Sequence, residues 1–175
     1  GSIGAGHNHT CRVRADNSAH CWGRDFAGAA TAPAGEFLQV VAGSAHSCGL
    51  LTNGTATCWG DNSFGQASAP GGVFVQLTAG FRFTCGLRAD GSAECWGQND
   101  QGQATPPPGT FAHLSGGSSH ACGLLTNGSA QCWGRAVEGQ TAAVPGNYVQ
   151  LALGASFSCG LGADGEVDCW GLNTE

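Results

Sequence analysis

The feature that most constrains this chain is a pair of cysteines that recurs at a fixed step. Cys48 and Cys58 form one such pair, and the pattern returns every 37 residues. Each second cysteine is followed by Trp-Gly, and glycines keep the same register before and after every pair. Five copies without an insertion predict a repeat architecture, so the function must be sought in the array and not in one isolated site. The remaining pairs are Cys11 and Cys21, Cys85 and Cys95, Cys122 and Cys132, and Cys159 and Cys169.

Each repeat has the pattern of three short strands. The first is typified by FLQVVAG (37–43), in which apolar residues alternate, and its counterparts start at Phe74, Phe111 and Tyr148. The other two are the arms of a hairpin around the cysteines, and a polar connector with Gly and Pro follows them. This unit predicts an all-β fold, a five-bladed β-propeller with three-stranded blades; a stacked β-solenoid is the alternative, but its coils are usually shorter. We expect one domain, 1–175, with repeats 1–36, 37–73, 74–110, 111–147 and 148–175.

The spacing within each cysteine pair indicates whether the two cysteines bind a metal, remain as reactive thiols or form a structural disulfide. Zinc ligand pairs usually lie two to four residues apart, whereas nine residues separate Cys48 from Cys58. The turn Thr52-Asn53-Gly54 suits a three-residue loop with a left-handed glycine, and Asn17 takes that glycine position in the first copy. A loop of this length places Cys48 opposite Cys58 at a non-hydrogen-bonded site, with Cα atoms about 4.5 Å apart. We therefore predict five intra-blade disulfides, not free thiols, and a secreted or cell-surface protein in an oxidising compartment.

Composition excludes several partners. Six arginines, no lysine and twelve carboxylates give a net charge of −6, without the basic stripe that nucleic-acid binding requires. No apolar run approaches the length of a membrane span. The chain opens Gly1-Ser2 without a charged leader, which we interpret as a mature or trimmed product, with Gly1-Ser2 as a possible cloning scar.

The points of the repeat at which the chain begins and ends bear on whether the blades close into a ring. The chain ends inside a connector and begins inside a first strand, so the break falls in a loop between blades. This phasing predicts a closed five-bladed ring with adjacent termini. A head-to-tail fibre remains the alternative.

The unit VVAGSAHSCGLLTNGTATCWGDNSFGQ (40–66) resembles the regulator of chromosome condensation repeat family. The residues that carry the resemblance are Ala42-Gly43 before the hairpin, Cys-Trp-Gly after it, and Gly65-Gln66. It is similar in particular to the cysteine-bearing bacterial type and to the short blades of the propeller-type β-lactamase inhibitor protein. The resemblance implies a β-propeller used as a recognition platform. The nucleotide exchange and chromatin binding of nuclear members do not carry over to this acidic, short-bladed chain.

Catalytic and metal sites are not expected. No motif pairs a nucleophile with a base, so we predict no enzyme and no cofactor. Two groups have metal-ligand chemistry, and ordinary solvated faces explain them better: His7, His9 and His20, and Asp164, Glu166 and Asp168. The repeated tryptophans are interpreted as core between blades. One repeat position holds His9, His46, Phe83, His120 and Phe157, and exchange with phenylalanine indicates packing.

The leading hypothesis is a non-enzymatic extracellular recognition module that binds a protein or glycan through variable loops, a glycan binder being a lectin. Variable positions are the connectors and the residues after the register glycine, such as His7, Ser44, Phe81, Ser118 and Ala155. The candidate ligand-binding residues are Phe81, Arg82, Phe64, Arg24 and Arg135. The alternative is a self-assembling structural subunit of an extracellular fibre, sheath or surface layer. Asn8, Asn53 and Asn127 lie in glycosylation sequons that matter only in a permissive host.

Overall fold

The computed structural model describes residues 1–172 and contains five antiparallel sheets of three strands each, which we call blades one to five. Their strands, in blade order, are β1 Ile3–Ala5, β2 His9–Val13 and β3 Ala19–Gly23; β4 Phe37–Ala42, β5 His46–Leu51 and β6 Ala56–Gly60; β7 Gln76–Ala79, β8 Phe83–Leu87 and β9 Ala93–Gly97; β10 Phe111–Gly116, β11 His120–Leu125 and β12 Ala130–Gly134; β13 Tyr148–Leu153, β14 Phe157–Gly162 and β15 Val167–Gly171. A single 3-10 turn, η1 (Phe26–Gly28), follows β3. The all-β propeller blades predicted from the repeat are confirmed, although β7 begins at Gln76 and not at the buried Phe74.

The hairpin turns have the predicted three-residue loop. The amide of Leu51 donates to the carbonyl of Thr55 at 2.9 Å, and that of Gly54 donates back to Leu51 at 2.9 Å. Gly54 has a φ of 83° and Asn17 a φ of 63°, so both occupy the left-handed region that the loop requires. This turn aligns Cys48 directly with Cys58 in the strand register.

All ten cysteines form the five predicted intra-blade disulfides, which close β2 on β3 and the corresponding strands of the other blades. The paired Cα atoms lie 4.0 Å to 4.1 Å apart. This is closer than the roughly 4.5 Å of a non-hydrogen-bonded pair. Each staple ties together the two strands of a hairpin that has only one further strand beside it.

Successive blades pack through two unlike surfaces. We call the side of a blade that carries the disulfide its sulfur face, and the opposite side, with the tryptophan, its tryptophan face. Cys48 and Leu50 on the sulfur face of blade two pack against Phe74, Leu77 and Trp96 on the tryptophan face of blade three. The same arrangement joins blades one and two, three and four, and four and five.

One backbone oxygen in each connector completes the joint between blades. The indole Nε1 of Trp59 and the hydroxyl of Ser47 both donate to the carbonyl of Ala29, at 2.9 Å each. Trp96, Trp133 and Trp170 donate in the same way to the connector ahead of their own blade. The interpretation of the tryptophans as core is therefore confirmed for these four.

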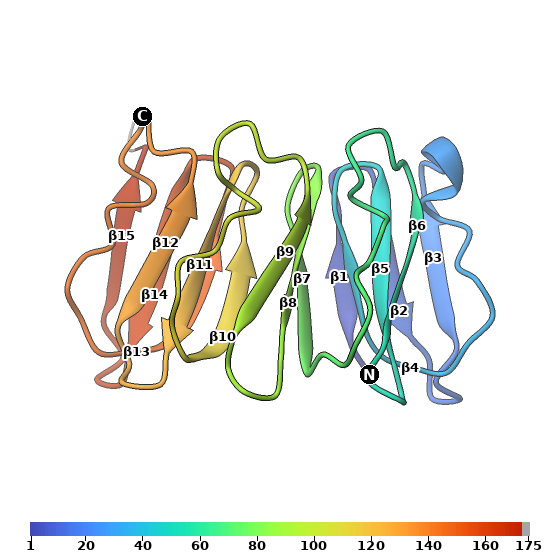
Figure 1. Cartoon of the computed structure of the whole chain (residues 1–175), viewed down its shortest axis with the longest axis horizontal. Helices are drawn as coiled ribbons and strands as arrows, with labels where there is room; N and C mark the ends of the chain where they lie inside the picture. Colours follow the sequence, from blue (N-terminus) through green and yellow to red (C-terminus); the bar gives the residue numbers. More distant parts are fainter. Residues whose placement is uncertain (173–175) are drawn as a thin grey trace.

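The five blades form an open arc, so the predicted closed ring with adjacent termini is wrong. Figure 1 shows blade one (blue) and blade five (red) at opposite ends of the longest axis. Substantial contacts between sheets join only consecutive blades within residues 1–172. Trp22 at one end is 44% exposed and Phe157 at the other is 45% exposed, although their counterparts are packed. The repeat shows at which point of a blade the chain begins and ends. The rotation from one blade to the next depends instead on how side chains pack at each joint.

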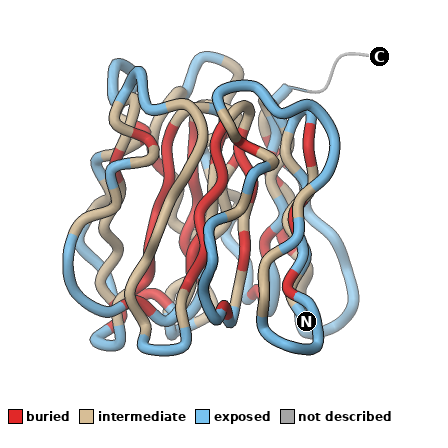
Figure 2. The backbone as a smooth tube through the Cα atoms, turned by 90° about the vertical axis from the view of Figure 1, so that its right-hand side faces the viewer, coloured by how far each residue is buried: buried red, intermediate tan, exposed pale blue. Residues whose placement is uncertain are grey.

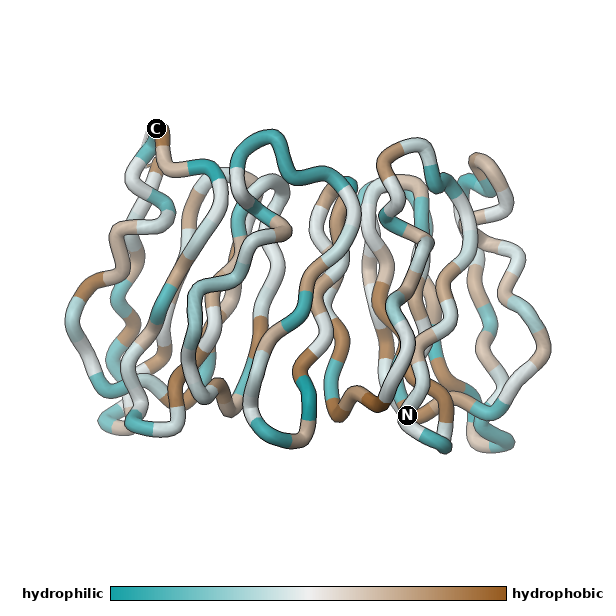
Figure 3. Tube along the Cα trace, viewed as in Figure 1, coloured by the Kyte–Doolittle hydropathy of each residue, from teal (hydrophilic) through white to brown (hydrophobic). Residues whose placement is uncertain are grey.

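Burial and hydropathy follow the same plan. Figure 2 shows buried residues concentrated along the strands and exposed residues in the loops at the upper and lower edges. The connector that follows β9, at the upper edge, contains a strongly hydrophilic stretch in Figure 3. Polar, exposed side chains are therefore found among the connectors at the upper edge.

Candidate functional site

Two kinds of loop meet at the upper edge of the arc: those joining the first and second strands of each blade, and the beginnings of the connectors. Residues of all five blades surround an inner hollow of about 210 Å³, and residues of blades one to three surround an adjoining outer hollow of about 230 Å³. His7, Ser44 and Phe81 line both hollows. We call the two hollows together the rim site.

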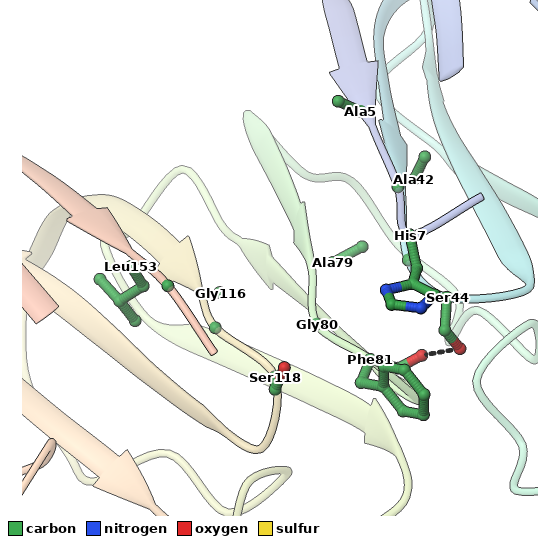
Figure 4. Close-up of a pocket in the computed structure, with 14 residues that line it drawn as sticks. Ala5, His7, Ala42, Ser44, Ala79, Gly80, Phe81, Gly116, Ser118 and Leu153 are labelled. Carbon is green, nitrogen blue, oxygen red and sulfur yellow. Dashed lines mark hydrogen bonds between the residues drawn. The ribbon is translucent and has the colours of Figure 1, made fainter. Parts of the chain in front are cut away.

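The inner hollow is built mainly from backbone. It holds four of the predicted variable positions, namely His7, Ser44, Phe81 and Ser118, while Ala155 is not part of it (Figure 4). The amide of Ser44 donates to the carbonyl of Phe81 at 3.0 Å, and the amide of Phe81 donates to Ser118 at 3.0 Å. The Ser44 hydroxyl also donates to the Phe81 carbonyl, as the dashed line in Figure 4 marks. These bonds fix the loops of adjacent blades relative to one another.

Two aromatic rings lie close to the charge of Arg82. Its guanidinium carbon lies 4.8 Å from the centre of the Phe64 ring and 5.4 Å from that of Phe81. Phe64 comes from the connector between β6 and β7. There the buried side-chain oxygen of Gln66 accepts a hydrogen bond from the backbone N–H of Phe64 at 2.8 Å. Three of the candidate ligand-binding residues, Phe64, Phe81 and Arg82, therefore lie together although they come from two neighbouring blades.

Arg24 joins the outer hollow from the first connector, together with Phe26. Its guanidinium lies 5.9 Å from the Phe26 ring centre. Arg24 forms no salt bridge with the neighbouring Asp25 within residues 1–172, and the Asp25 carboxylate accepts bonds from the Thr31 hydroxyl and the Ala30 amide. The Thr31 hydroxyl, followed by the Ala30 amide, lowers the pKa of Asp25 below its usual value.

The rim site therefore holds two of the four arginines that form no salt bridge within residues 1–172, on a protein that is acidic as a whole. Among residues 1–172, the ion pairs involving arginine are Arg88 with Glu94 and Arg135 with Glu138. Arg24 and Arg82 have no such carboxylate in that part of the chain. The acidic group that lines the outer hollow is Asp61, whose carboxylate accepts bonds from Ser63 and Gln66.

Arg135 is not part of this arrangement. It lies in the connector after β12 and its guanidinium binds Glu138 at 2.6 Å. The sequon residues Asn8, Asn53 and Asn127 are all exposed; Asn8 lines the outer hollow, and Asn53 and Asn127 organise hairpin turns.

The three histidines with metal-ligand chemistry do not converge, whereas Asp164, Glu166 and Asp168 line one hollow beside Tyr148. His9 is buried against Ser47, and His20 lies beside Trp22, with ring centres 5.8 Å apart. No group of three or more His, Cys, Asp or Glu side chains suited to a metal occurs in residues 1–172. His7 instead meets the Phe81 ring edge-on, with centres 5.9 Å apart.

Sequence reasoning missed two members of the rim site, Phe26 and Asp61. Both lie in connectors that were identified as variable, but a turn role explained Asp61 and no repeat counterpart singled out Phe26. Ala27, next to Phe26, has a φ of 54°, which is uncommon for alanine and is not found at the same repeat position of the other connectors. The first connector thus departs from the others in a way that its residue types alone do not reveal.

These features define a class of protein, a disulfide-stapled β-propeller array with one asymmetric cationic and aromatic rim. Residues 37–66, 74–103, 111–140 and 148–175 match the regulator of chromosome condensation (RCC1) repeat. The chain belongs to this family, as the cysteine-flanked motifs of its repeats indicated. A comparison with curated protein sequences finds no match.

Solved structures with the same architecture include plant receptor ectodomains. The ectodomain of the receptor kinase CR4 from Physcomitrella patens is 31% identical, with a TM-score of 0.80 over 97% of this chain and 49% of that chain. The CRINKLY WD40 ectodomain of ACR4 from Arabidopsis thaliana is 28% identical, with a TM-score of 0.80 over 97% of this chain and 62% of that one. This chain thus spans less than two thirds of either relative.

Prp20p from Saccharomyces cerevisiae shows the same fold at lower identity. It is 20% identical, with a TM-score of 0.82 over 97% of this chain and 56% of that chain. Propellers of this family act mostly by binding or exchange. Five disulfides and the ectodomain relatives indicate an extracellular, oxidising location. No helix in residues 1–172 has the length and apolar character needed to cross a membrane.

Proposed function

We propose that this protein is a non-enzymatic extracellular recognition module that binds a protein partner through the rim site. The observation that carries the proposal is the asymmetry of the rim: Arg82 lies against both Phe64 and Phe81 and lines one hollow with Arg24, and no other blade among residues 1–172 repeats this set. A lectin with equivalent sites would instead present similar pockets at every joint between blades. Those joints are filled by core side chains.

The chemistry of the rim site favours an acidic segment that also carries an apolar side chain. Arg24 and Arg82 supply charged donors for carboxylates. The exposed parts of Phe26, Phe64 and Phe81 supply apolar contact, and aromatic and arginine residues are the types enriched at interfaces. The Prp20p structure is described together with binding to Gsp1p and histones, so protein recognition is a use to which this fold is put elsewhere.

A peptide array tests this proposal. The probes are immobilised peptides that combine Asp or Glu with Phe, Leu or Tyr, set against the same peptides with Lys in place of the acids. We expect the acidic set to bind, and Arg82→Ala or Phe81→Ala to weaken binding at least about tenfold, as for central interface residues. Arg135→Ala is the matched control, because it removes an arginine outside the rim site.

Two results would contradict the proposal. Binding that is equal for the acidic and the lysine peptides would exclude charge recognition by the rim. Selective binding on a glycan array that Arg82→Ala abolishes would assign the rim site to a carbohydrate instead of a protein.

A self-assembling structural subunit is the second candidate. The uncovered faces of blades one and five favour it, since Trp22 and Phe157 are exposed where their counterparts are packed. Electron microscopy of concentrated protein tests it: filaments would support this candidate, and separate particles at every concentration would reject it.

A further inference from the structure

The first strands of blades two to five share an exposed apolar position at the lower edge of the arc. Leu38, Val75 and Val149 occupy this position in blades two, three and five, and they are 55%, 56% and 57% exposed. Ala112, at the same repeat position in blade four, is also exposed. We call these four residues the lower row. Figure 3 shows hydrophobic positions along this edge, where the first strands begin.

A β-bulge explains why these side chains are not part of the core. In blades two, four and five the pairing between the first and second strands shifts by one residue at this position. The extra residue of a bulge is left out of the ladder, and its side chain is re-aimed. On either side of Leu38, Phe37 and Val40 are buried, so the core between blades is filled without it.

The strands that carry the lower row lie side by side. The side-chain amide of Gln39, next to Leu38, binds both the N–H and the carbonyl of Leu77 in β7, at 2.8 Å and 3.0 Å. The amide of Gln76, next to Val75, joins β7 to β10 in the same way. The lower row therefore passes from blade to blade along one edge.

Val73 widens this surface between blades two and three. It is 56% exposed, and a Cβ atom added at Gly54 would meet its side chain, so Val73 lies against the hairpin turn of blade two. Leu38, Val73 and Val75 thus form the most apolar part of the lower edge. Blades two and three each have a neighbour on both sides, so the ends of the arc do not account for the exposure of these three residues.

The residue types in the lower row distinguish it from other exposed positions of the repeat. The position after the register glycine varies freely between copies, from His7 and Ser44 to Phe81. The lower row is apolar in all four copies although it is exposed in each. Single exposed apolar residues are ordinary, but a contiguous exposed apolar surface indicates contact with another molecule.

Acidic residues share this edge with the lower row. They lie in the hairpin turns and directly before the first strand of blade two, and all are exposed: Asp16, Glu36, Asp90 and Asp164. Arg88 is the basic residue nearest to the row in blade three, and its charge is paired with Glu94. A further N–H of Arg88 donates to the carbonyl of Gly71 at 3.0 Å. The lower edge therefore combines an apolar surface with negative charge.

We propose that the lower row is an interaction surface for a protein segment that combines apolar side chains with lysine or arginine. The apolar side chains of such a segment pack on Leu38, Val73 and Val75, and its cations lie beside Glu36 and the acidic turns. This surface is at the edge opposite the rim site, and the proposal does not depend on that site.

Charge argues against a second copy of this chain as the occupant. The chain has a net charge of −6 and contains no lysine. A contact between two lower edges would set the same acidic turns against each other, and like charges in such a contact repel. The same repulsion acts between this edge and an anionic membrane.

Peptide binding by the 175-residue chain, measured by isothermal titration calorimetry, tests the proposal. The probe is a short amphipathic peptide of leucine and lysine. Two related peptides are compared with it, one with glutamate in place of lysine and one with serine in place of leucine. We expect only the leucine–lysine peptide to bind, and the double variant Leu38→Ser, Val75→Ser to weaken its binding at least about tenfold. Glu36→Gln is expected to weaken binding less and to reduce its dependence on salt.

Val137→Ser is the matched control for the double variant. Val137 is 77% exposed in the connector after β12, outside the lower row. We expect this change to leave the binding of the leucine–lysine peptide unaltered, and Arg82→Ala in the rim site likewise. The midpoint of thermal unfolding shows that each variant is folded, since the replaced side chains are exposed.

Three results would overturn the proposal. The first is a leucine–lysine peptide that binds no better than its two relatives, or equally well to the unaltered chain and to the double variant. The second is binding to neutral phosphatidylcholine vesicles that the double variant abolishes, which would assign the lower row to a lipid surface. The third is self-association in sedimentation equilibrium that the double variant abolishes, which would make a second copy the occupant.

Discussion

Three buried histidines lie at the joints between blades, and each is held neutral by its surroundings. Burial lowers the pKa of His46 and of His120 from 6.5 to about 4, and it lowers the pKa of His9 as well. The charges of Asp61 and Glu138 oppose the effect at His46 and His120 respectively, but they do not outweigh desolvation. The Nδ1 atoms of all three lack a partner among the residues described, so a proton there would enter an apolar setting.

This burial predicts that the protein loses stability in mild acid. Above about pH 6.5 the histidines are neutral in both states, and their full contribution is present. As the pH falls toward 4 the unfolded chain takes up protons that the folded chain does not. The free energy of unfolding then falls by up to about 1.4 kcal/mol per pH unit for each histidine. Urea denaturation between pH 7 and pH 4.5 measures this slope.

The pair His46→Phe with Thr84→Ala serves as the control for this prediction. The Thr84 hydroxyl lies 2.9 Å from His46 Nε2, and the double change reproduces the natural combination of Phe83 and Ala121, so it removes one titrating group while filling the joint. We expect a shallower dependence on pH in this variant. An unchanged slope would assign the acid sensitivity to carboxylates instead of the buried histidines.

At the scale of the blade, the disulfides differ in their surroundings although their spacing is the same. Cys169 is exposed and Cys159 is partly exposed, because no further blade covers them. The first cysteine of every other pair is fully buried. A thiol reductant must reach the sulfur atoms, so accessibility separates the fifth staple from the rest.

We therefore predict that Cys159–Cys169 is reduced first. Brief treatment with dithiothreitol, alkylation and peptide mass spectrometry would identify the cysteines that react. The same treatment in denaturant is the reference, where the five pairs should react at similar rates. If Cys85–Cys95 in blade three reacted first in the folded protein, the packing described for the joints would be incorrect.

The structure is most predictable from the sequence at the scale of the single blade. The turn Thr52-Asn53-Gly54 fixes the hairpin register, and the register fixes which cysteines meet, so the staples follow from local chemistry. The rotation between blades depends on how side chains such as Phe37 and Trp59 pack across a joint, which spacing does not encode. The rim site was recovered only in part: Phe26 lies in a connector whose backbone, with a φ of 54° at Ala27, differs from that of the other connectors. Arg135 was included for its residue type alone, and Glu138 pairs with it.

At the scale of the molecule, the arc behaves as a one-dimensional stack. Blades two to four each have two neighbours, while blades one and five each have one. In repeat arrays, stability is approximately a sum of terms for each unit and for each joint with a neighbour. The two ends are therefore expected to open more readily than the middle.

Hydrogen exchange measured by mass spectrometry tests this expectation with the disulfides intact. Amides in β8 of blade three should exchange most slowly, and those in β14 and β2 faster. Uniform protection across all five blades would indicate a single cooperative unit and contradict the stack.

The single carbonyl that anchors each connector has a consequence for how this molecule can change. Ala29 and Gln140 accept the tryptophan and hydroxyl protons through backbone oxygen, which any amino acid supplies. The exposed side chains elsewhere in each connector, unlike the buried Ala29 and Gln140 themselves, are therefore relieved of a role in holding neighbouring blades together. Evolution, or a protein engineer, can rewrite one connector at a time and obtain a new surface on an unaltered frame. The array is in this sense a natural display scaffold.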